Sequence, residues 1–107
     1  MDPSPTEPHL PLSATDFHVL LVLWDGALYG YAIMKAVEEE SGGAVVPEIG
    51  SLYRVLARLM GEGLVEEADA PDEPGPHPGR ARKYYRLTGQ GRSAARAEAA
   101  RLKDVLG

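Results

Sequence analysis

Apolar side chains recur at helical spacing in four stretches of the chain, and two shorter stretches have the composition of strands. The first predicted helix begins after Ser13, whose hydroxyl can cap the first turn, and ends before Gly26. The second covers about residues 29–41 and stops at a glycine pair. The third runs from about residue 50 to 61. Three leucines at positions i, i+4 and i+7 form its buried stripe: Leu52, Leu56 and Leu59.

The two predicted strands are residues 64–69 and 83–88, and the proline- and glycine-rich segment 70–79 between them predicts an exposed loop. Together these segments predict a β-hairpin with a long tip. Thr88 then offers an N-cap for a fourth helix that extends to about residue 106. One stripe of this helix consists of Ala95, Ala99, Leu102 and Leu106, and its small alanines allow another helix to approach closely.

The first helix is apolar on almost every side. Phe17, Leu20, Leu21 and Trp24 follow helical spacing along one face, and aliphatic side chains also occupy the opposite face. A helix of this kind must be covered on two sides. Because so short a chain has little material for a second layer, we expect a partner subunit to cover it. The alternative is cover by the C-terminal helix of the same chain. Trp24 is either part of the core or a platform for a ligand.

The chain has 107 residues, a net charge of −5 and no cysteine. This length indicates one domain, and the lack of cysteine excludes disulfides, thiol catalysis and thiolate metal sites. Residues 1–12 contain four prolines, so we expect a disordered tail in place of a secretory signal. The longest apolar run, residues 19–24, is too short to span a membrane. These features predict a cytoplasmic protein.

Positive charge is concentrated toward the C-terminus. Residues 1–79 hold three basic and 14 acidic side chains, whereas residues 80–107 hold eight basic and two acidic ones. Such an asymmetry indicates that one region of the chain meets a polyanion. The alternative is a basic helix that is only solvated.

Three helices followed by a hairpin is the element order of a winged helix-turn-helix, in which the third helix enters the major groove of DNA. The face of the third helix opposite its leucine stripe carries Arg54 and Arg58, one turn apart, and both can donate to guanine or phosphate. Ser51, near the helix start, can reach a phosphate or a base. The alternative for both arginines is a solvated or salt-bridged side chain, for example an ion pair with Glu62, four residues after Arg58.

Further cations and a tyrosine extend the predicted DNA-binding surface. Arg80, Arg82 and Lys83 lie at the return strand of the hairpin, or wing, where they suit phosphate or minor-groove contact. Tyr29 lies at the start of the second helix, where the positive end of the helix dipole favours a phosphate. Core packing is an equally good use for its ring.

Three separated motifs resemble the PadR family of bacterial transcriptional regulators. They are residues 28–33, 47–65 and 79–91, and they occur in the order typical of that family. The resemblance covers about residues 13–107. It implies a winged-helix homodimer that binds palindromic operator DNA, usually as a repressor, with the first and last helices at the dimer interface.

By this resemblance the segment 50–54 begins the recognition helix, so Ser51, Tyr53 and Arg54 are expected DNA contacts. Tyr53 also lies on the flank of the buried stripe and has a half-core role as its alternative. The expected fold is mainly α with a small β-hairpin, as a winged helix over residues 13–88 and a C-terminal dimerisation helix over residues 89–107. The expected dimer interface consists of Phe17, Leu20, Trp24, Ala95, Ala99, Leu102 and Leu106.

No catalytic or metal-binding pattern is visible in the sequence. The three histidines fall in the tail, the first helix and the proline-rich loop, without a Ser/His/acid trio or a spaced ligand set. We therefore expect no enzyme and no cofactor. The expected partners are double-stranded DNA and a second copy of the chain, with a small-molecule effector left open. The alternative is a winged-helix module that binds protein without specific DNA binding, which the acidic net charge favours.

Overall fold

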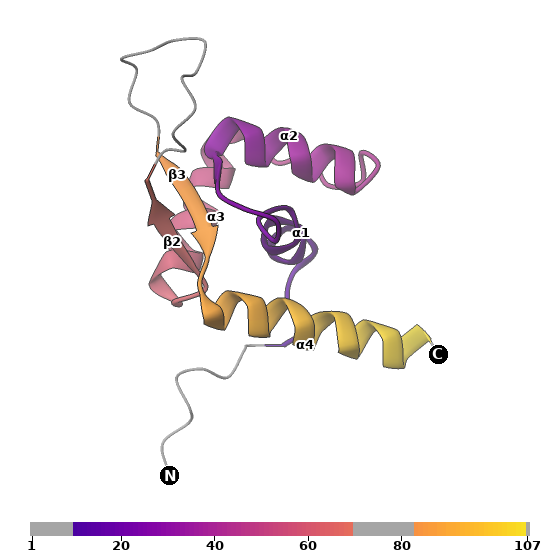
Figure 1. The fold of residues 1–107 in the computed structure, drawn as a ribbon. Helices are drawn as coiled ribbons and strands as arrows, with labels where there is room; N and C mark the ends of the chain where they lie inside the picture. The colour runs from indigo at the N-terminus through magenta and orange to yellow at the C-terminus, as the bar shows by residue number, and fades with distance from the viewer. Residues whose placement is uncertain (1–9, 70–82, 107) are drawn as a thin grey trace.

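The computed structural model describes residues 10–69 and 83–106. All four predicted helices are present, and the two predicted strands lie where the sequence places them. The elements follow in the order α1 (Ala14–Val22), β1 (Leu28–Tyr29), α2 (Gly30–Glu40), α3 (Ile49–Gly61), β2 (Val65–Ala68), β3 (Tyr84–Leu87) and α4 (Gly89–Leu106). Figure 1 shows α1 nearly end-on between α2 and α4, with the strands and α3 on one side of the molecule.

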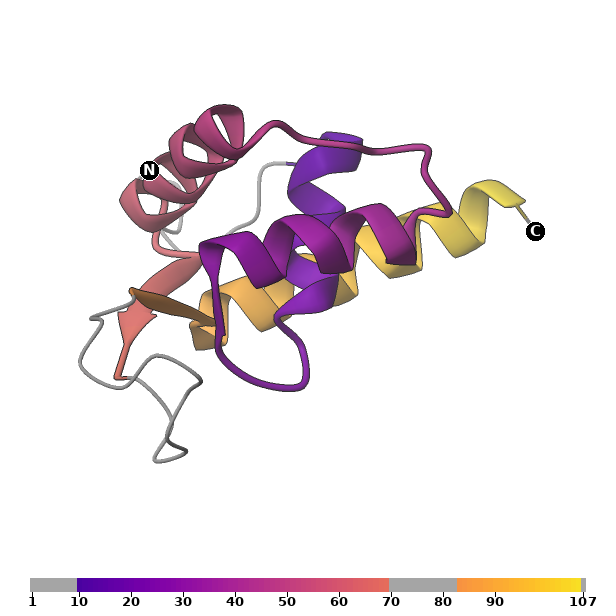
Figure 2. The ribbon, with the colours of Figure 1, turned by 90° about the horizontal axis from the view of Figure 1, so that it is seen from above.

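Helix α1 is the centre of the helical packing. Val19, Leu20 and Leu23 are buried, and α1 contacts α2 on one side and α4 on the other. Figure 2, seen from above, shows the same arrangement, with α1 crossing between α2 and α4. The expectation that a partner subunit must supply the second cover is therefore wrong for most of this helix, because α4 of the same chain supplies it. The alternative that the sequence left open, cover by the C-terminal helix of the same chain, is confirmed.

Two hydroxyl side chains begin helices as the sequence predicts. The Oγ of Ser13 accepts a hydrogen bond from the backbone N–H of Asp16 at 3.1 Å. The Oγ1 of Thr88 accepts from the N–H of Gly91 at 3.0 Å and donates to the carbonyl of Gly63 at 2.6 Å. A side chain at Gly91 would collide with the carbonyl oxygen of Leu64. The start of α4 is thus held tightly against the turn that leads into β2.

The sheet has three antiparallel strands in the order β1-β3-β2, one more than the predicted hairpin. In β1, Leu28 lies opposite Tyr85 and Tyr29 opposite Tyr84. A strand of two residues is too short to produce an alternating pattern, which is why the sequence did not reveal it. Its consequence is structural, because β1 runs directly into α2 and so ties the start of that helix to the wing. The predicted loop 70–79 lies outside the described residues.

The N-terminal segment joins the body earlier than expected. Residues 1–9 of the predicted tail lie outside the described residues, but Leu12 packs against the core. The Glu98 carboxylate accepts two hydrogen bonds from Arg101, each 2.8 Å long, and a further one from the backbone of Leu12. These bonds, chiefly those from Arg101, lower the pKa of Glu98. Leu12 therefore belongs to the folded unit and not to the tail.

Candidate nucleic-acid interface

Helix α3 buries the face that carries its three leucines and exposes the opposite face. Leu52, Leu56 and Leu59 are in the core, while Ser51 and Arg54 are exposed. The first turn of α3 contains no acidic residue, and the side chain of its N-cap residue, Glu48, makes no capping hydrogen bond. Arg54 forms no ion pair with any carboxylate in residues 10–69 and 83–106. Its guanidinium is thus available to an external anion.

Tyr53 projects from α3 toward the start of α2. Its side chain is 47% exposed and is not part of the core. A Cβ built on Gly30 would lie 2.6 Å from the Tyr53 hydroxyl and 2.8 Å from the ring carbon that bears it. The ring therefore covers the first residue of α2, a position that only glycine leaves open. Its hydroxyl is presented beside the N-terminal end of that helix.

We expect Gly30→Ala to displace the Tyr53 ring without unfolding the protein, because the ring is half-exposed and can turn outward. The free energy of unfolding, measured by thermal denaturation, should change by less than about 1 kcal/mol, which is the range of a glycine-to-alanine exchange in a helix. If Tyr53 contacts DNA, Gly30→Ala and Tyr53→Leu should weaken duplex binding by similar factors in fluorescence anisotropy. Gly89→Ala is the matched control, because a Cβ there meets no atom within 4 Å. Full affinity in Gly30→Ala alongside weak binding in Tyr53→Leu would contradict this placement.

The wing lies next to this corner of the molecule. The rings of Tyr29 and Tyr84 meet edge-on with centroids 5.7 Å apart, and Tyr29 is half-buried as the residue that precedes α2. Tyr85 points to the core, and burial raises the pKa of its hydroxyl. Lys83 is exposed and lies 3.4 Å from Glu67 across the hairpin. Of the predicted DNA contacts on the wing, only this lysine is described.

Not all wing cations are free for DNA. Arg86 Nε lies 2.7 Å from Glu66, its register partner on β2. This ion pair and the Lys83–Glu67 pair are well exposed, so each contributes little to stability and can rearrange. Arg80 and Arg82, both predicted phosphate contacts, lie outside the described residues.

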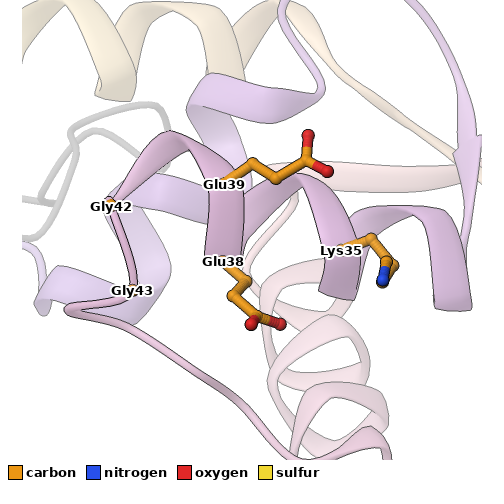
Figure 3. A pocket seen from close by; sticks show the side chains of 5 residues that line it. All are labelled: Lys35, Glu38, Glu39, Gly42 and Gly43. Carbon is orange, nitrogen blue, oxygen red and sulfur yellow. The ribbon is translucent and has the colours of Figure 1, made fainter.

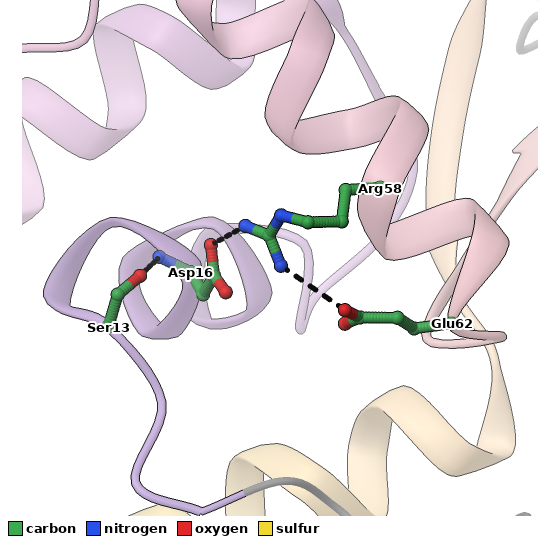
Figure 4. A network of polar contacts seen from close by, with 4 residues as sticks. All are labelled: Ser13, Asp16, Arg58 and Glu62. Carbon is green, nitrogen blue, oxygen red and sulfur yellow. Dashed lines mark hydrogen bonds and ion pairs between the residues drawn. The ribbon is translucent and has the colours of Figure 1, made fainter.

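Arg58 occupies a different environment from Arg54. Its Nη2 donates to Oδ1 of Asp16 at 2.6 Å, and its Nη1 donates to Oε2 of Glu62 at 3.4 Å (Figure 4). The hydrogen bond to Asp16 is the main cause of a raised pKa for Arg58. The pair with Glu62 confirms the alternative that the sequence left open. The pair with Asp16 joins positions 42 residues apart, which no local spacing rule reveals.

A shallow groove of about 300 Å³ separates α1 from α4. The Trp24 ring contributes an aromatic surface to its lining. The guanidinium carbons of Arg92 and Arg96 lie 4.8 and 5.3 Å from the centre of this ring, and Arg92 also donates to the Trp24 carbonyl at 3.1 Å. The residues that line the groove are Leu21, Trp24, Ala95, Arg96 and Ala99. The two faces predicted to meet a partner thus converge on one apolar strip.

The structure corrects one residue of the predicted interface. Leu20 is 0% exposed and lies in the core of its own chain, so it has no surface to offer a partner. Leu21, one position later, lines the groove instead. The signal was present in the sequence, because residues 17, 21 and 24 form an outer stripe at i, i+4 and i+7. The remaining predicted positions are half-buried or exposed, apart from the buried Ala95 on the groove floor: Phe17, Trp24, Ala99, Leu102 and Leu106.

The far end of α2 offers no alternative surface for nucleic acid. A hollow of about 260 Å³ there is lined by Lys35, Glu38, Glu39, Gly42 and Gly43 (Figure 3). Its two carboxylates outnumber its single cation and would repel phosphate. Within the described ranges, no group of three or more His, Asp and Glu side chains is arranged to hold a metal ion. In the same ranges no helix is long and apolar enough to cross a bilayer.

Helices α1 to α3, a three-stranded sheet whose β2–β3 hairpin is the wing, and an exposed arginine on α3 define a winged-helix protein of the DNA-binding, transcription-regulator class. The sequence profile described as the transcriptional regulator PadR-like family matches residues 19–97. The chain belongs to this family. Its members are transcriptional regulators and not enzymes.

The chain is similar to one further protein in sequence and to two solved structures in fold. An uncharacterised 37.1 kDa protein in a transposon of Streptomyces fradiae is 42% identical over 81 residues, or 76% of this chain. The chain spans only 21% of the length of that protein. A PadR family transcription regulator from Clostridium difficile has the same fold, with a TM-score of 0.71 at 22% identity over 87% of this chain and 91% of that one. Bacillus subtilis PadR in complex with operator DNA gives a TM-score of 0.65 at 24% identity, covering 79% of this chain and 46% of that one.

Proposed function

We propose that this chain is a sequence-specific DNA-binding repressor that acts as a homodimer on a palindromic operator. The observation that carries the proposal is the exposed face of α3, where Arg54 pairs with no carboxylate of residues 10–69 and 83–106 and Ser51 lies near the helix start. An arginine in this position is suited to bidentate recognition of guanine in the major groove. The operator complex of the Bacillus subtilis relative supports the same use of the fold.

The tyrosines beside the start of α2 and the cations of the wing are proposed to position the protein on the phosphate backbone. Tyr53 and Tyr29 lie at the start of α2, where the helix dipole favours an anion. Lys83 supplies a cation on the wing, and Arg80 and Arg82 precede it in the sequence. Contacts to phosphate hold the register of the complex without reading sequence. Specificity is accordingly assigned to α3, and general affinity to the wing and the start of α2.

The homodimer is proposed from the groove between α1 and α4. This groove is apolar, and the far end of α4 continues beyond it with Val105 and Leu106 at 70% and 87% exposure. Burying this strip against its copy would remove apolar surface from water, the main driving force for association. Two recognition helices related by a two-fold axis then meet half-sites about one helical turn, roughly 34 Å, apart. A bound dimer represses by excluding other proteins from the same DNA.

The decisive experiment is selection of duplexes from a random library by the purified protein, followed by fluorescence anisotropy across a salt series. We expect enrichment of a two-fold symmetric sequence. Its affinity should fall steeply with salt, with a log–log slope of about −0.9 for each phosphate neutralised. A scrambled duplex should bind more weakly at every salt concentration. Absence of any enriched sequence, with uniformly weak binding, would instead favour a winged-helix module that binds protein.

A further inference from the structure

Asp16 and Arg58 form an ion pair that the proposed function does not use. Asp16 lies in the first turn of α1, and its carboxylate is only 10% exposed. The Ser13 hydroxyl accepts a hydrogen bond from the backbone N–H of Asp16, and the Asp16 carboxylate accepts one from Arg58, as Figure 4 shows. A carboxylate this buried must have a cation or strong donors, because it has lost most of its hydration. One of the two arginines of α3, Arg58, is therefore paired with a residue of α1.

The surroundings of Arg58 make it a poor phosphate ligand. Two carboxylates flank its guanidinium, at 2.6 Å for Asp16 and 3.4 Å for Glu62. The three groups together carry one negative charge, so an approaching phosphate meets net repulsion. Arg54, one turn earlier on the same helix, has no such partners within the described residues. Two arginines that look equivalent in the sequence are thus chemically different in the fold.

The Asp16–Arg58 ion pair also connects α1 with α3, two helices that pack on different parts of the fold. Helix α3 packs chiefly on α2, whereas α1 packs on α2 and α4 and carries the groove residues Leu21 and Trp24. Asp16 and Arg58 link α1 directly to α3. A shift of α3 relative to α1 would alter the separation of the two recognition helices in a dimer built on that groove. The ion pair is placed to hold this separation constant.

We propose that Asp16 and Arg58 are positioning residues, which fix the recognition helix relative to the dimer face and thereby set the half-site spacing that the protein accepts. In this role Arg58 does not contact DNA. The proposal rests on the proposed function, and it replaces the sequence-based expectation that Arg58 binds DNA.

The isosteric variant Asp16→Asn gives the sharpest test, because the two roles of Arg58 predict opposite signs. If Arg58 only positions α3, loss of the Asp16 charge should weaken binding of the selected operator about tenfold. Arg58→Gln should weaken it by a similar factor, and the double variant should be no weaker than either single one. If Arg58 instead binds phosphate, Asp16→Asn releases it and should tighten binding, while Arg58→Gln should reduce the salt slope by about 0.9.

Half-site spacing provides the readout that a loss of stability alone does not change. Operators with one base pair added or removed between the half-sites should bind the wild type poorly and both variants with much less discrimination. Glu62→Gln is the matched control, because that carboxylate is 36% exposed and its pair with Arg58 is long, so its affinity and spacing preference should stay within about twofold of wild type. Unchanged spacing preference in Asp16→Asn, or tighter binding, would overturn the proposal. If the wild type selects no operator, the proposed function fails first.

Discussion

Replacing Arg54 with alanine is expected to abolish most of the preference for the operator over other DNA. A good bidentate contact to a base contributes about 1–3 kcal/mol of discrimination, so operator affinity should fall roughly 10- to 100-fold. Affinity for a scrambled duplex should hardly change, because phosphate contacts elsewhere supply it. The expectation follows from the exposure of Arg54 and its lack of an ion-pair partner in the described part of the chain.

The measurement is anisotropy with operator and scrambled duplexes across the same salt series. Lys35→Ala is the control, since it removes the same charge from an exposed site on α2 that lies beside Glu38 and Glu39. This control variant should bind both duplexes like the wild type. Equal losses on operator and scrambled DNA in Arg54→Ala would mean that Arg54 contacts phosphate. No loss on either would remove α3 from the proposed interface.

The second large effect is expected from Ala99→Glu, which places a carboxylate in the apolar groove between α1 and α4. Ala99 is exposed and lines this groove together with Leu21 and Trp24. Burying a carboxylate in the proposed dimer interface is unfavourable even beside Arg96, which lines the same groove, because both charges must then lose water. The variant should therefore be monomeric at concentrations where the wild type is expected to be a dimer. Operator affinity should then fall about 10²- to 10⁴-fold, because each half-site binds independently.

Sedimentation velocity measures the oligomeric state, and anisotropy measures the loss on the operator. Ala100→Glu is the matched control, because it puts the same charge on the adjacent exposed position of α4, about 100° around the helix and outside the groove. That variant should remain dimeric and bind normally. A dimer that survives Ala99→Glu but not Ala100→Glu would place the interface on the other side of α4.

Local sequence signals were sufficient for the helices and their caps. The Ser13 and Thr88 hydroxyls begin α1 and α4 as expected, because an N-cap depends on residues within three positions of one another. The leucine stripe of α3 likewise requires only helical periodicity, and it correctly predicted which face is exposed. The motifs at residues 28–33, 47–65 and 79–91 were enough to indicate the family.

Contacts between distant positions were decided only by the tertiary structure. Periodicity showed that α1 is apolar all round, but not that α4 covers it or that Leu20 is internal while Leu21 lines the groove. The two-residue strand β1 exists only because β3 supplies its hydrogen-bond partners. Arg54 and Arg58 share residue type, helix and face, and what separates them is Asp16, which is 42 positions from Arg58. Charge pairing depends on distance in space, so the sequence distinguished the two arginines only by Glu62, and the fold added Asp16 beside Arg58 while Arg54 pairs with no carboxylate in the described part of the chain.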